Sequence, residues 1–399
     1  MIDEVPRAPA DPASALEAAR NLAPRFAERA TTHDTQGVFP ADDFTDLRES
    51  GLLGLMVPAR LGGIGAGFAD YARVAAELGT GAGSTALIFN MHASVTGALA
   101  LVSDDLARAF GVPDGFFTAR DRVLTEVLGG KLFGVAMSER GAGSRLSSLT
   151  TSYTPVEGGY RITGSKAFVS GAGHVDAYLV AARATITTAD QPVVSQFLVP
   201  AGPGVRVEKT WDSLGMRATG SHDVHFDVTV GSDALLGGVE GLALLLAEVM
   251  PQWLVASYAA VYVGVAQASI DAAVAHLRER KLHTLPSVRA RVGRADATVA
   301  GARAAVAEAA RRVDTAPGEP ETNRWAWRAK LLAGDVAATV ASSMLEAAGA
   351  SASRRGHPLE RLYRDARCGA LQPATSDVCA DHLGSTALDP DGDTAVSRW

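Results

Sequence analysis

A segment rich in glycine and serine is the first stretch of this sequence whose residue types suit ligand binding. It reads "FGVAMSERGAGSRLSSL", and a short apolar run leads into Gly141, Gly143 and several hydroxyl side chains. Glycines permit close backbone approach and expose N–H groups, and serines add donors, so the loop suits an anionic or polar ligand such as a phosphate. Because it matches neither GxGxxG nor the P-loop lysine pattern, it supports no nicotinamide or ATP site.

Other residues with catalytic potential lack the spacing that metal or nucleophilic sites require. The histidines occur without HExxH or paired-cysteine patterns, so no metal site is expected. A GxSxG nucleophile motif is also missing. The two cysteines, Cys368 and Cys379, are expected to remain reduced in a cytoplasmic chain.

The elements that must position the glycine-rich loop fall into three regions. Residues 12–129 repeat apolar side chains at helical spacing, whereas short β-branched and aromatic runs fill residues 131–237. Helical periodicity then returns, with helices expected at about Leu242–Leu282, Ser287–Val313 and Thr322–Ala350. Long alanine-rich helices with short connections are typical of an up-and-down bundle.

This pattern predicts an α+β fold with three domains. An N-terminal α-helical domain is expected at residues 1–130, a β-barrel-like domain at 131–237 and a C-terminal four-helix bundle at 238–399. The sequence contains no fixed-period repeat.

The composition of the chain limits the binding partners and the cellular location that we expect. With 399 residues, 47% of them hydrophobic, the chain can bury a large core. Its net charge of -7 arises from interspersed acids and bases, so nucleic acid is not an expected partner. The N-terminus lacks the basic and apolar segments of a signal peptide, and polar residues interrupt the longest apolar runs. We therefore expect a cytoplasmic protein that does not bind a membrane.

Four segments in order resemble the acyl-CoA dehydrogenase superfamily of flavoproteins. They are "VAMSERGAGS", "GYRITGSKAFVSGAG", "LGMRATGSHDVHF" and "HPLERLYRDAR", and the resemblance covers nearly the whole chain. It implies that FAD lies between the β domain and the C-terminal bundle and reaches towards a neighbouring subunit. It also implies a homotetramer or a homodimer.

The resemblance also implies individual flavin contacts. The Gln-Phe-Gly triplet that follows the family's arginine is absent here, which leaves the adenine side of the site less defined. The implied cofactor-binding residues are Met137 and Ser138 beside the ring, Ser144 in the GAGS motif, Phe168 with Ser170 at the other edge of the ring, and Arg280 and Thr375 on the adenosine side.

The position of the family's catalytic base is altered. In the family, a glutamate eight residues after the Asp of the "RDA" motif removes the α proton, and its backbone N–H polarises the thioester carbonyl. Counting from Asp365 gives Pro373, which has neither a carboxylate nor an N–H. An alternative position, at the start of the first bundle helix, aligns with the apolar Leu254. Ordinary dehydrogenation is therefore expected to be slow.

Three acids elsewhere could replace the missing base. Asp377 lies one helical turn beyond Pro373, while Glu248 and Glu346 lie on apolar bundle helices. Each of these acids also has an ordinary structural explanation, either as a solvated or capping residue or as a member of a helix-surface ion pair.

The run "AAGASASRRGHPLERLYRDAR" and the absence of the Gln-Phe-Gly triplet resemble a second branch of the superfamily, the flavin-dependent monooxygenases and N-hydroxylases. The resemblance implies reduced flavin supplied by a separate reductase, with FMN as an alternative to FAD, and a C4a-hydroperoxide in a dry pocket. Ser138, Ser170 and His92 are the candidate donors, although His92 could equally be a core histidine bonded to a carbonyl.

Three functions remain open from the sequence. The first is a flavin monooxygenase acting on a small or carrier-linked substrate, and the second is an atypical acyl-CoA or acyl-carrier-protein dehydrogenase with a relocated base. The third is a non-catalytic homologue. The expected catalytic residues are His92, Ser170 and Asp377, and the expected substrate pocket contains Asn90, Met91, Leu254, Gln372 and Pro373.

Overall fold

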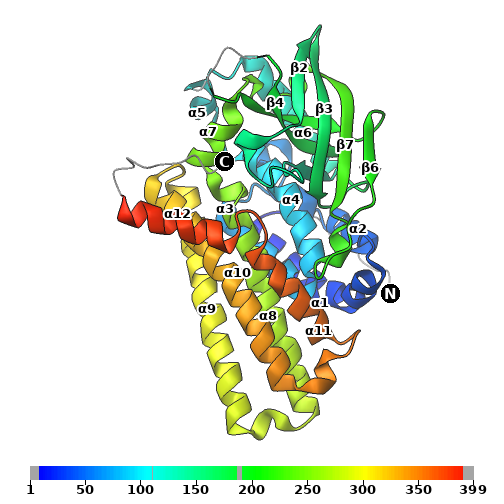
Figure 1. Cartoon of the computed structure of the whole chain (residues 1–399), viewed down its shortest axis with the longest axis vertical. Helices are drawn as coiled ribbons and strands as arrows, with labels where there is room; N and C mark the ends of the chain where they lie inside the picture. Colours follow the sequence, from blue (N-terminus) through cyan, green and yellow to red (C-terminus); the bar gives the residue numbers. More distant parts are fainter. Residues whose placement is uncertain (1–8, 110, 187–190, 390–399) are drawn as a thin grey trace.

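The three-region layout predicted from the sequence is present in the structure, a computed structural model that describes residues 9–109, 111–186 and 191–389. Figure 1 shows a β domain at one end, N-terminal helices beside it and a long helical bundle extending away from both. The domain boundaries at 130 and 237 remain a prediction. Residues 1–8, part of the segment used to exclude a signal peptide, lie outside the described residues.

The N-terminal region is helical, and its first helix has clear capping signals at both ends. Asp11 caps the first helix by accepting a hydrogen bond from the Ser14 backbone N–H at 2.8 Å, and Gly37 ends it with a φ of 62°. The helices of this region are α1 (Pro12–Gln36), α2 (Ala41–Glu49), α3 (Phe68–Gly81), α4 (Gly83–Ala100), α5 (Asp104–Ala109) and α6 (Asp114–Leu128).

The middle region is a seven-stranded sheet with the order β1-β4-β2-β3-β7-β6, and β5 pairs with β4. The pairing of β3 with β7 is antiparallel and shifts register between Lys166 and Val169, which marks a bulge. The strands are β1 (Phe133–Ala136), β2 (Ser152–Val156), β3 (Gly159–Val169), β4 (Ala177–Ala184), β5 (Val194–Pro200), β6 (Val205–Glu208) and β7 (His222–Gly231).

The C-terminal region departs from the sequence prediction at its start. Instead of one helix over Leu242–Leu282, a short α7 is separated from α8 by a bend at Met250 and the 3₁₀ turn η7 (Pro251–Trp253). Proline lacks the N–H that would continue the α7 ladder, so the helix stops there. The helices are α7 (Leu242–Val249), α8 (Ala256–Glu279), α9 (Pro286–Thr315), α10 (Pro320–Ala348), α11 (Pro358–Arg367) and α12 (Ser376–Leu388).

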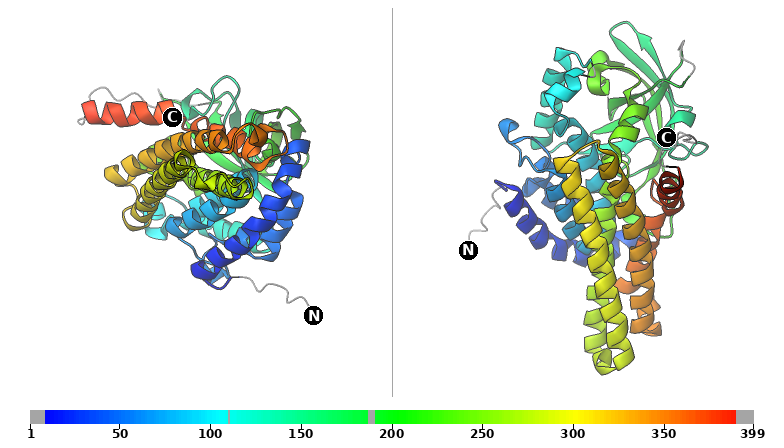
Figure 2. Two further views of the ribbon diagram at one scale, coloured as in Figure 1. Left: turned by 90° about the horizontal axis from the view of Figure 1, so that it is seen from below. Right: turned by 90° about the vertical axis from the view of Figure 1, so that its left-hand side faces the viewer.

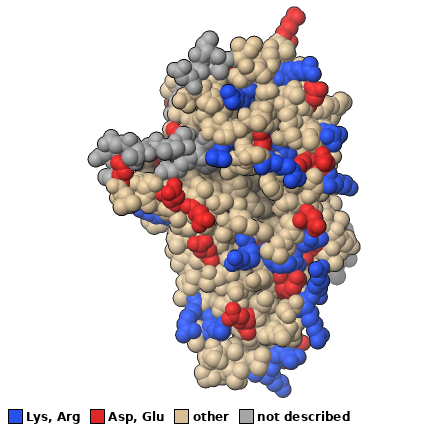
Figure 3. Space-filling model, viewed as in Figure 1, with Lys and Arg blue, Asp and Glu red and all other residues tan. Residues whose placement is uncertain are grey.

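Two helical segments, Pro251–Glu279 and Pro320–Ala348, are long and apolar enough to cross a membrane by length and composition. This is weak evidence, because the apolar window of the first is 83% buried inside the protein, as expected for a core helix. Figure 2 shows α8 and α10 running together within the bundle. On the face seen in Figure 3, acidic and basic residues are interspersed.

A close contact between two helices joins the N-terminal region to the bundle. Gly79 of α3 and Gly264 of α8 face each other, and a Cβ on Gly264 would lie 2.2 Å from the Ala76 carbonyl oxygen. Both backbones therefore approach more closely than any larger residue would permit. Because α4 follows α3 directly, this contact also fixes the helix that forms one wall of the cavity described below.

Replacing this glycine should destabilise the protein. Gly264→Ala is expected to lower the free energy of unfolding by about 1 to 3 kcal/mol, because the added methyl group must displace backbone atoms. The control is Gly301→Ala in the exposed middle of α9, where no atom lies within 4 Å of an added Cβ. That change should raise the free energy of unfolding by about 0.5 to 1 kcal/mol. Equal effects in urea unfolding would contradict the close-contact explanation.

Candidate functional site

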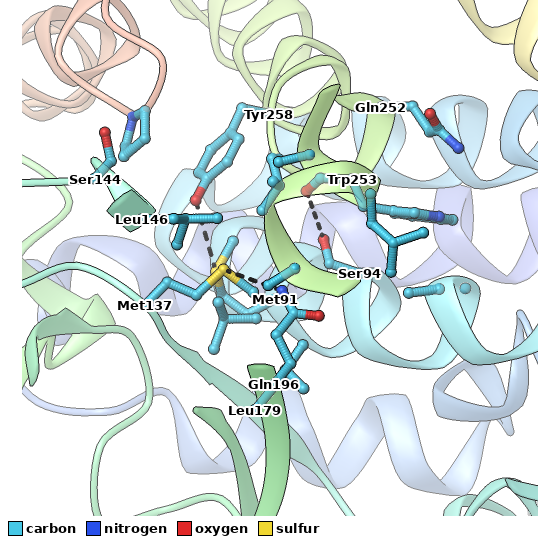
Figure 4. Close-up of a pocket in the computed structure, with 18 of the residues that line it drawn as sticks. Met91, Ser94, Met137, Ser144, Leu146, Leu179, Gln196, Gln252, Trp253 and Tyr258 are labelled. Carbon is cyan, nitrogen blue, oxygen red and sulfur yellow. Dashed lines mark hydrogen bonds between the residues drawn. The ribbon is translucent and has the colours of Figure 1, made fainter. Parts of the chain in front are cut away.

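A cavity of about 750 Å³ lies where the three regions meet. Its walls come from α4 and α6, from the ends of β1 and β3, from α7 and the start of α8, and from the loop that precedes α12. Figure 4 shows labelled side chains from α4, the segment after β1, β4, β5 and the start of α8 converging on one space. A volume of this size fits a small ligand together with part of a cofactor.

Most of the residues expected to bind the cofactor or the substrate line this cavity. Their individual roles remain predictions, but the fold brings them to one place although they are far apart in sequence. The expected residues in the lining are Met91, Met137, Ser138, Ser144, Phe168, Ser170, Leu254, Gln372, Pro373 and Thr375.

Phe168 is directed into the cavity by the bulge in β3. Its φ of 59° is in the left-handed region, which is strained for a residue with a large side chain. The side chain is 59% exposed, and its ring meets Trp211 edge-on at a centroid distance of 6.3 Å. An aromatic side chain held exposed in a strained conformation suits a planar ligand that would cover it.

A buried ion pair fixes the glycine-rich loop against β3. Lys166 Nζ donates to Glu139 Oε1 at 2.9 Å and to the Met137 carbonyl at 3.1 Å, and both charged side chains are buried. Burial alone would raise the pKa of the Glu139 carboxyl, but hydrogen bonds from Thr150 and the charge of Lys166 lower that pKa to about 2. Burial lowers the pKa of Lys166 to about 8. The pair therefore positions Met137 and Ser138 at the cavity wall.

A second buried lysine holds the loop that carries Pro373. Lys330 of α10 donates to the carbonyl oxygens of Gly369 and Ala374, each at 2.9 Å. Burial lowers the pKa of this lysine to about 8. The two contacts bracket Pro373, so its position depends on backbone carbonyls on either side of it.

Both charged side chains in the cavity lining are already engaged within the protein. Arg120 donates to the carboxylates of Asp104 at 2.7 Å and Asp121 at 3.1 Å. The Asp314 carboxylate accepts hydrogen bonds from the backbone N–H groups of Phe68 and Ala69 at 2.7 and 2.9 Å, so it caps the start of α3. Within the described residues, Asp314 is the one carboxylate that the cavity lining contains.

Several polar lining residues were not anticipated from the sequence. In Figure 4 the Tyr258 hydroxyl points to the Met91 sulfur, and Gln196 points to the Met137 sulfur. Gln252 enters from η7. These side chains lie in apolar stretches without a motif, so the sequence offered no signal for them. Ser221 was within a quoted motif but had been given no role.

His92 does not reach the cavity, which corrects its expected role as a donor. It is buried, its Nε2 is 2.9 Å from the Leu53 carbonyl, and its Nδ1 accepts the Phe133 backbone N–H at 3.1 Å. Burial lowers its pKa to about 4, so the ring is neutral near neutral pH. His92 is a structural residue that fastens α4 to β1.

Four other residues that the sequence analysis proposed for the site also lie outside the cavity lining. Asn90 is buried and accepts a hydrogen bond from the Tyr71 hydroxyl, so its side chain supports α4. Asp377 is exposed in the first turn of α12. Glu248 is exposed, and Glu346 forms an exposed ion pair with Arg291. No acid that the sequence offered as a replacement base lines the cavity.

Arg280 lies at the exposed C-terminal end of α8, within the bundle. It is not in the lining of the cavity. Its expected contact with the adenosine side of a neighbouring subunit remains a prediction. Among the residues that the structure describes, no group of three or more His, Cys, Asp or Glu side chains could hold a metal ion.

Family models match the chain in the same order as its three regions. The acyl-CoA dehydrogenase N-terminal domain matches residues 13–109, the middle domain 134–229 and the C-terminal domain 255–386. The chain therefore belongs to the acyl-CoA dehydrogenase superfamily. It is a flavin-dependent oxidoreductase, with FAD or FMN as its cofactor.

Relatives with different reactions are similar to this chain at comparable levels. L-evernosamine nitrososynthase from Micromonospora sp. is 29% identical over 97% of this chain and 93% of its own length. The mitochondrial short-chain specific acyl-CoA dehydrogenase of Bos taurus is 28% identical over 88% of this chain and 84% of its own. Similarity alone therefore does not choose the reaction.

One solved structure combines this fold with oxygenation. Dibenzothiophene monooxygenase TdsC from Paenibacillus sp. A11-2 has a TM-score of 0.81 to this chain, with 26% identity over 94% of this chain and 97% of its own. TdsC has also been described in a complex with FMN and indole. The cavity residues here fit a flavin, since the lining combines several hydroxyl groups, the strained Phe168 and Gly143, whose φ of 63° suits glycine.

The buried ion pair beneath this wall should govern stability in acid. Glu139→Gln is expected to lower the free energy of unfolding by about 3 kcal/mol near neutral pH, because it leaves Lys166 buried without a carboxylate. The folded-state pKa of Glu139 lies below its ordinary value of 4.5, so its contribution is present above that value and is lost as pH falls towards about 2. Wild type and variant should therefore converge in acid.

The control for this experiment is Glu308→Gln. The pKa of Glu308 is also about 2, through hydrogen bonds from Arg311 and Arg312, but this pair is on the surface. Solvent weakens the contribution of such exposed contacts, so this variant should lose much less stability than Glu139→Gln and its stability difference from wild type should change less with pH. Urea unfolding between neutral pH and about pH 3 measures both effects. Parallel curves for wild type and Glu139→Gln would contradict the assignment.

Proposed function

We propose that this protein is a flavin-dependent monooxygenase that acts on a small, largely apolar substrate. The observation that carries the proposal is the state of the acids around the cavity. The family's base position is Pro373, and the carboxylate of Asp314 is occupied as a helix cap. A thioester dehydrogenase needs a free carboxylate at the α proton, whereas oxygenation does not.

The composition of the cavity supports this assignment. The helices α4, α6 and α7 contribute mainly apolar side chains to the lining, and Arg120 of α6 is neutralised by its two aspartates. An apolar wall suits an aromatic or aliphatic substrate, and apolar surroundings protect a reactive oxygen species from side reactions. Gln196, Gln252 and Tyr258 supply polar groups that could orient one end of the substrate.

The residues of this chain would bind and orient the reactants. As the family resemblance implies, the flavin would be contacted by Ser138, Ser144, Phe168, Ser170 and Thr375, and the apolar side chains of α4, α6 and α7 would hold the substrate. When bound in its reduced form, the flavin supplies the two electrons with which one oxygen atom of dioxygen enters the product and the other leaves as water. A separate reductase would supply the reduced flavin.

A second candidate function is acyl-CoA dehydrogenation with an unusual base. Asp314 favours this alternative, because it is an acid in the lining and a conformational change that released α3 would free it. The similarity to the short-chain acyl-CoA dehydrogenase supports the same alternative.

The two functions differ in a direct experiment on the flavin-loaded protein. Under anaerobic conditions, short-chain acyl-CoA esters should leave the oxidised flavin absorbance unchanged. The chemically reduced protein mixed with isotope-labelled dioxygen and indole should give a product that contains the label. Bleaching by an acyl-CoA ester without a reductase would overturn the proposal and favour the dehydrogenase.

The role of the base position can be tested by restoring a carboxylate. Pro373→Glu should raise the rate of flavin bleaching by acyl-CoA at least about tenfold, because a positioned general base contributes about 10² to 10⁴ in rate. Pro373→Gln is the matched control, since it restores the backbone N–H and a side chain of similar size without the acid. Equal rates for the two variants would show that residue 373 is not the base position in this chain.

A further inference from the structure

Three buried hydroxyl groups form a continuous chain that ends at the cavity. The pairing of Val169 in β3 with His222 in β7 places Ser170 opposite Ser221, and their Oγ atoms are 2.9 Å apart. Thr219 Oγ1 is 2.7 Å from Ser221 Oγ and 2.8 Å from the Met216 carbonyl oxygen. All three hydroxyl residues are buried, and both serines line the cavity.

The carbonyl at the end of the chain sets the direction of its protons. A carbonyl oxygen only accepts hydrogen bonds, so Thr219 must donate its proton to Met216; two oxygens 2.8 Å apart without a proton between them would repel. Thr219 Oγ1 then accepts the proton of Ser221, whose Oγ accepts the proton of Ser170. In this arrangement every hydroxyl proton is used within the chain.

The carbonyl that anchors this chain is itself firmly held. The Met216 backbone N–H donates to Asp365 Oδ1 of α11 at 2.6 Å, and Trp211 Nε1 donates to the Met216 carbonyl at 3.2 Å. Thr219 lies in the 3₁₀ turn η4 (Arg217–Thr219), and its backbone N–H also points to that carbonyl at 3.1 Å. Three donors thus surround the Met216 carbonyl oxygen. If the Thr219 hydroxyl turned its proton towards Ser221 instead, the carbonyl would lose its shortest hydrogen bond.

We propose that Ser221 and Thr219 are positioning residues that make Ser170 a hydrogen-bond acceptor towards the cavity. A flavin ring has an acceptor at N5 when it is oxidised and an N–H donor there when it is reduced. An acceptor at Ser170 therefore favours the reduced flavin over the oxidised form. This inference deepens the proposed function and rests on its placement of the flavin ring edge beside Ser170, but it does not depend on the reaction with oxygen.

The test is the ratio of dissociation constants for oxidised and reduced flavin, measured anaerobically with FMN and with FAD. Wild type is expected to bind the reduced form at least about tenfold more tightly, which corresponds to a shift of about +30 mV in the potential of the bound flavin. An equal or tighter affinity for the oxidised form would overturn the inference, as would binding of neither flavin.

Thr219→Val should reverse the direction of the chain. Without the Thr219 oxygen, the Ser221 proton has Ser170 as its acceptor, and the Ser170 proton then points to the cavity. The preference for reduced flavin should fall at least about tenfold, or about 30 mV. Ser221→Ala is a second variant, which removes the acceptor of Ser170 and should change the ratio in the same direction. An unchanged ratio in both folded variants would overturn the inference.

The matched control is Thr322→Val at a second buried threonine. The Thr322 hydroxyl has no hydrogen-bond partner among the described residues, and it does not line the cavity. This variant should keep the wild-type ratio. The test also separates the inference from the proposed function: bleaching by acyl-CoA with the expected ratios would reject oxygenation and keep the role of the hydroxyl chain. Normal oxygenation with unaltered affinity ratios in Thr219→Val and Ser221→Ala would keep the proposed function and reject the role of the hydroxyl chain.

Discussion

The hydrogen bond between Asp365 and the Met216 backbone N–H is the contact on which the geometry of the site depends. It joins α11 of the bundle to the turn that precedes β7, across a separation of 149 residues. Burial raises the pKa of Asp365, and the neighbouring Arg361 opposes that effect at 3.2 Å. The hydroxyl chain begins at the far side of Met216, and Pro373 follows Asp365 along the sequence. The buried carboxylate of Asp365 thus connects the part of the cavity lining that contains the hydroxyl chain with the part that contains Pro373.

The main features of the fold could be predicted because they depend on local patterns. Helical and strand periodicities gave the three regions, and the resemblance to one family agreed with them. The expected helix Leu242–Leu282 was wrong where Pro251 interrupts the backbone ladder, because the apolar pattern resumes after the interruption and both sides of it suit a helix. Composition could not separate two apolar helices from one.

The site was predictable only in part, since lining a cavity depends on side-chain direction as well as position. Met91 lines the cavity, but its neighbours Asn90 and His92 turn towards Tyr71 and towards Leu53 and Phe133. Adjacent residues on a helix point in different directions, and the faces that are buried are chosen by tertiary packing. Tyr258 and Gln252 were missed for the same reason, because nothing local distinguishes a cavity-facing polar residue in an apolar segment.

The contacts of Lys330 also bear on how such a site can change during evolution. Its two acceptors are the backbone carbonyls of Gly369 and Ala374, which every amino acid provides. These two contacts therefore do not require a particular side chain at residue 373, whereas proline there fixes its own φ and restricts the backbone of Gln372. A lineage could exchange an acid for proline there, or the reverse, while the lysine kept the loop in place. Lys330 thus maintains the backbone around residue 373 through contacts that do not involve the side chain at that position.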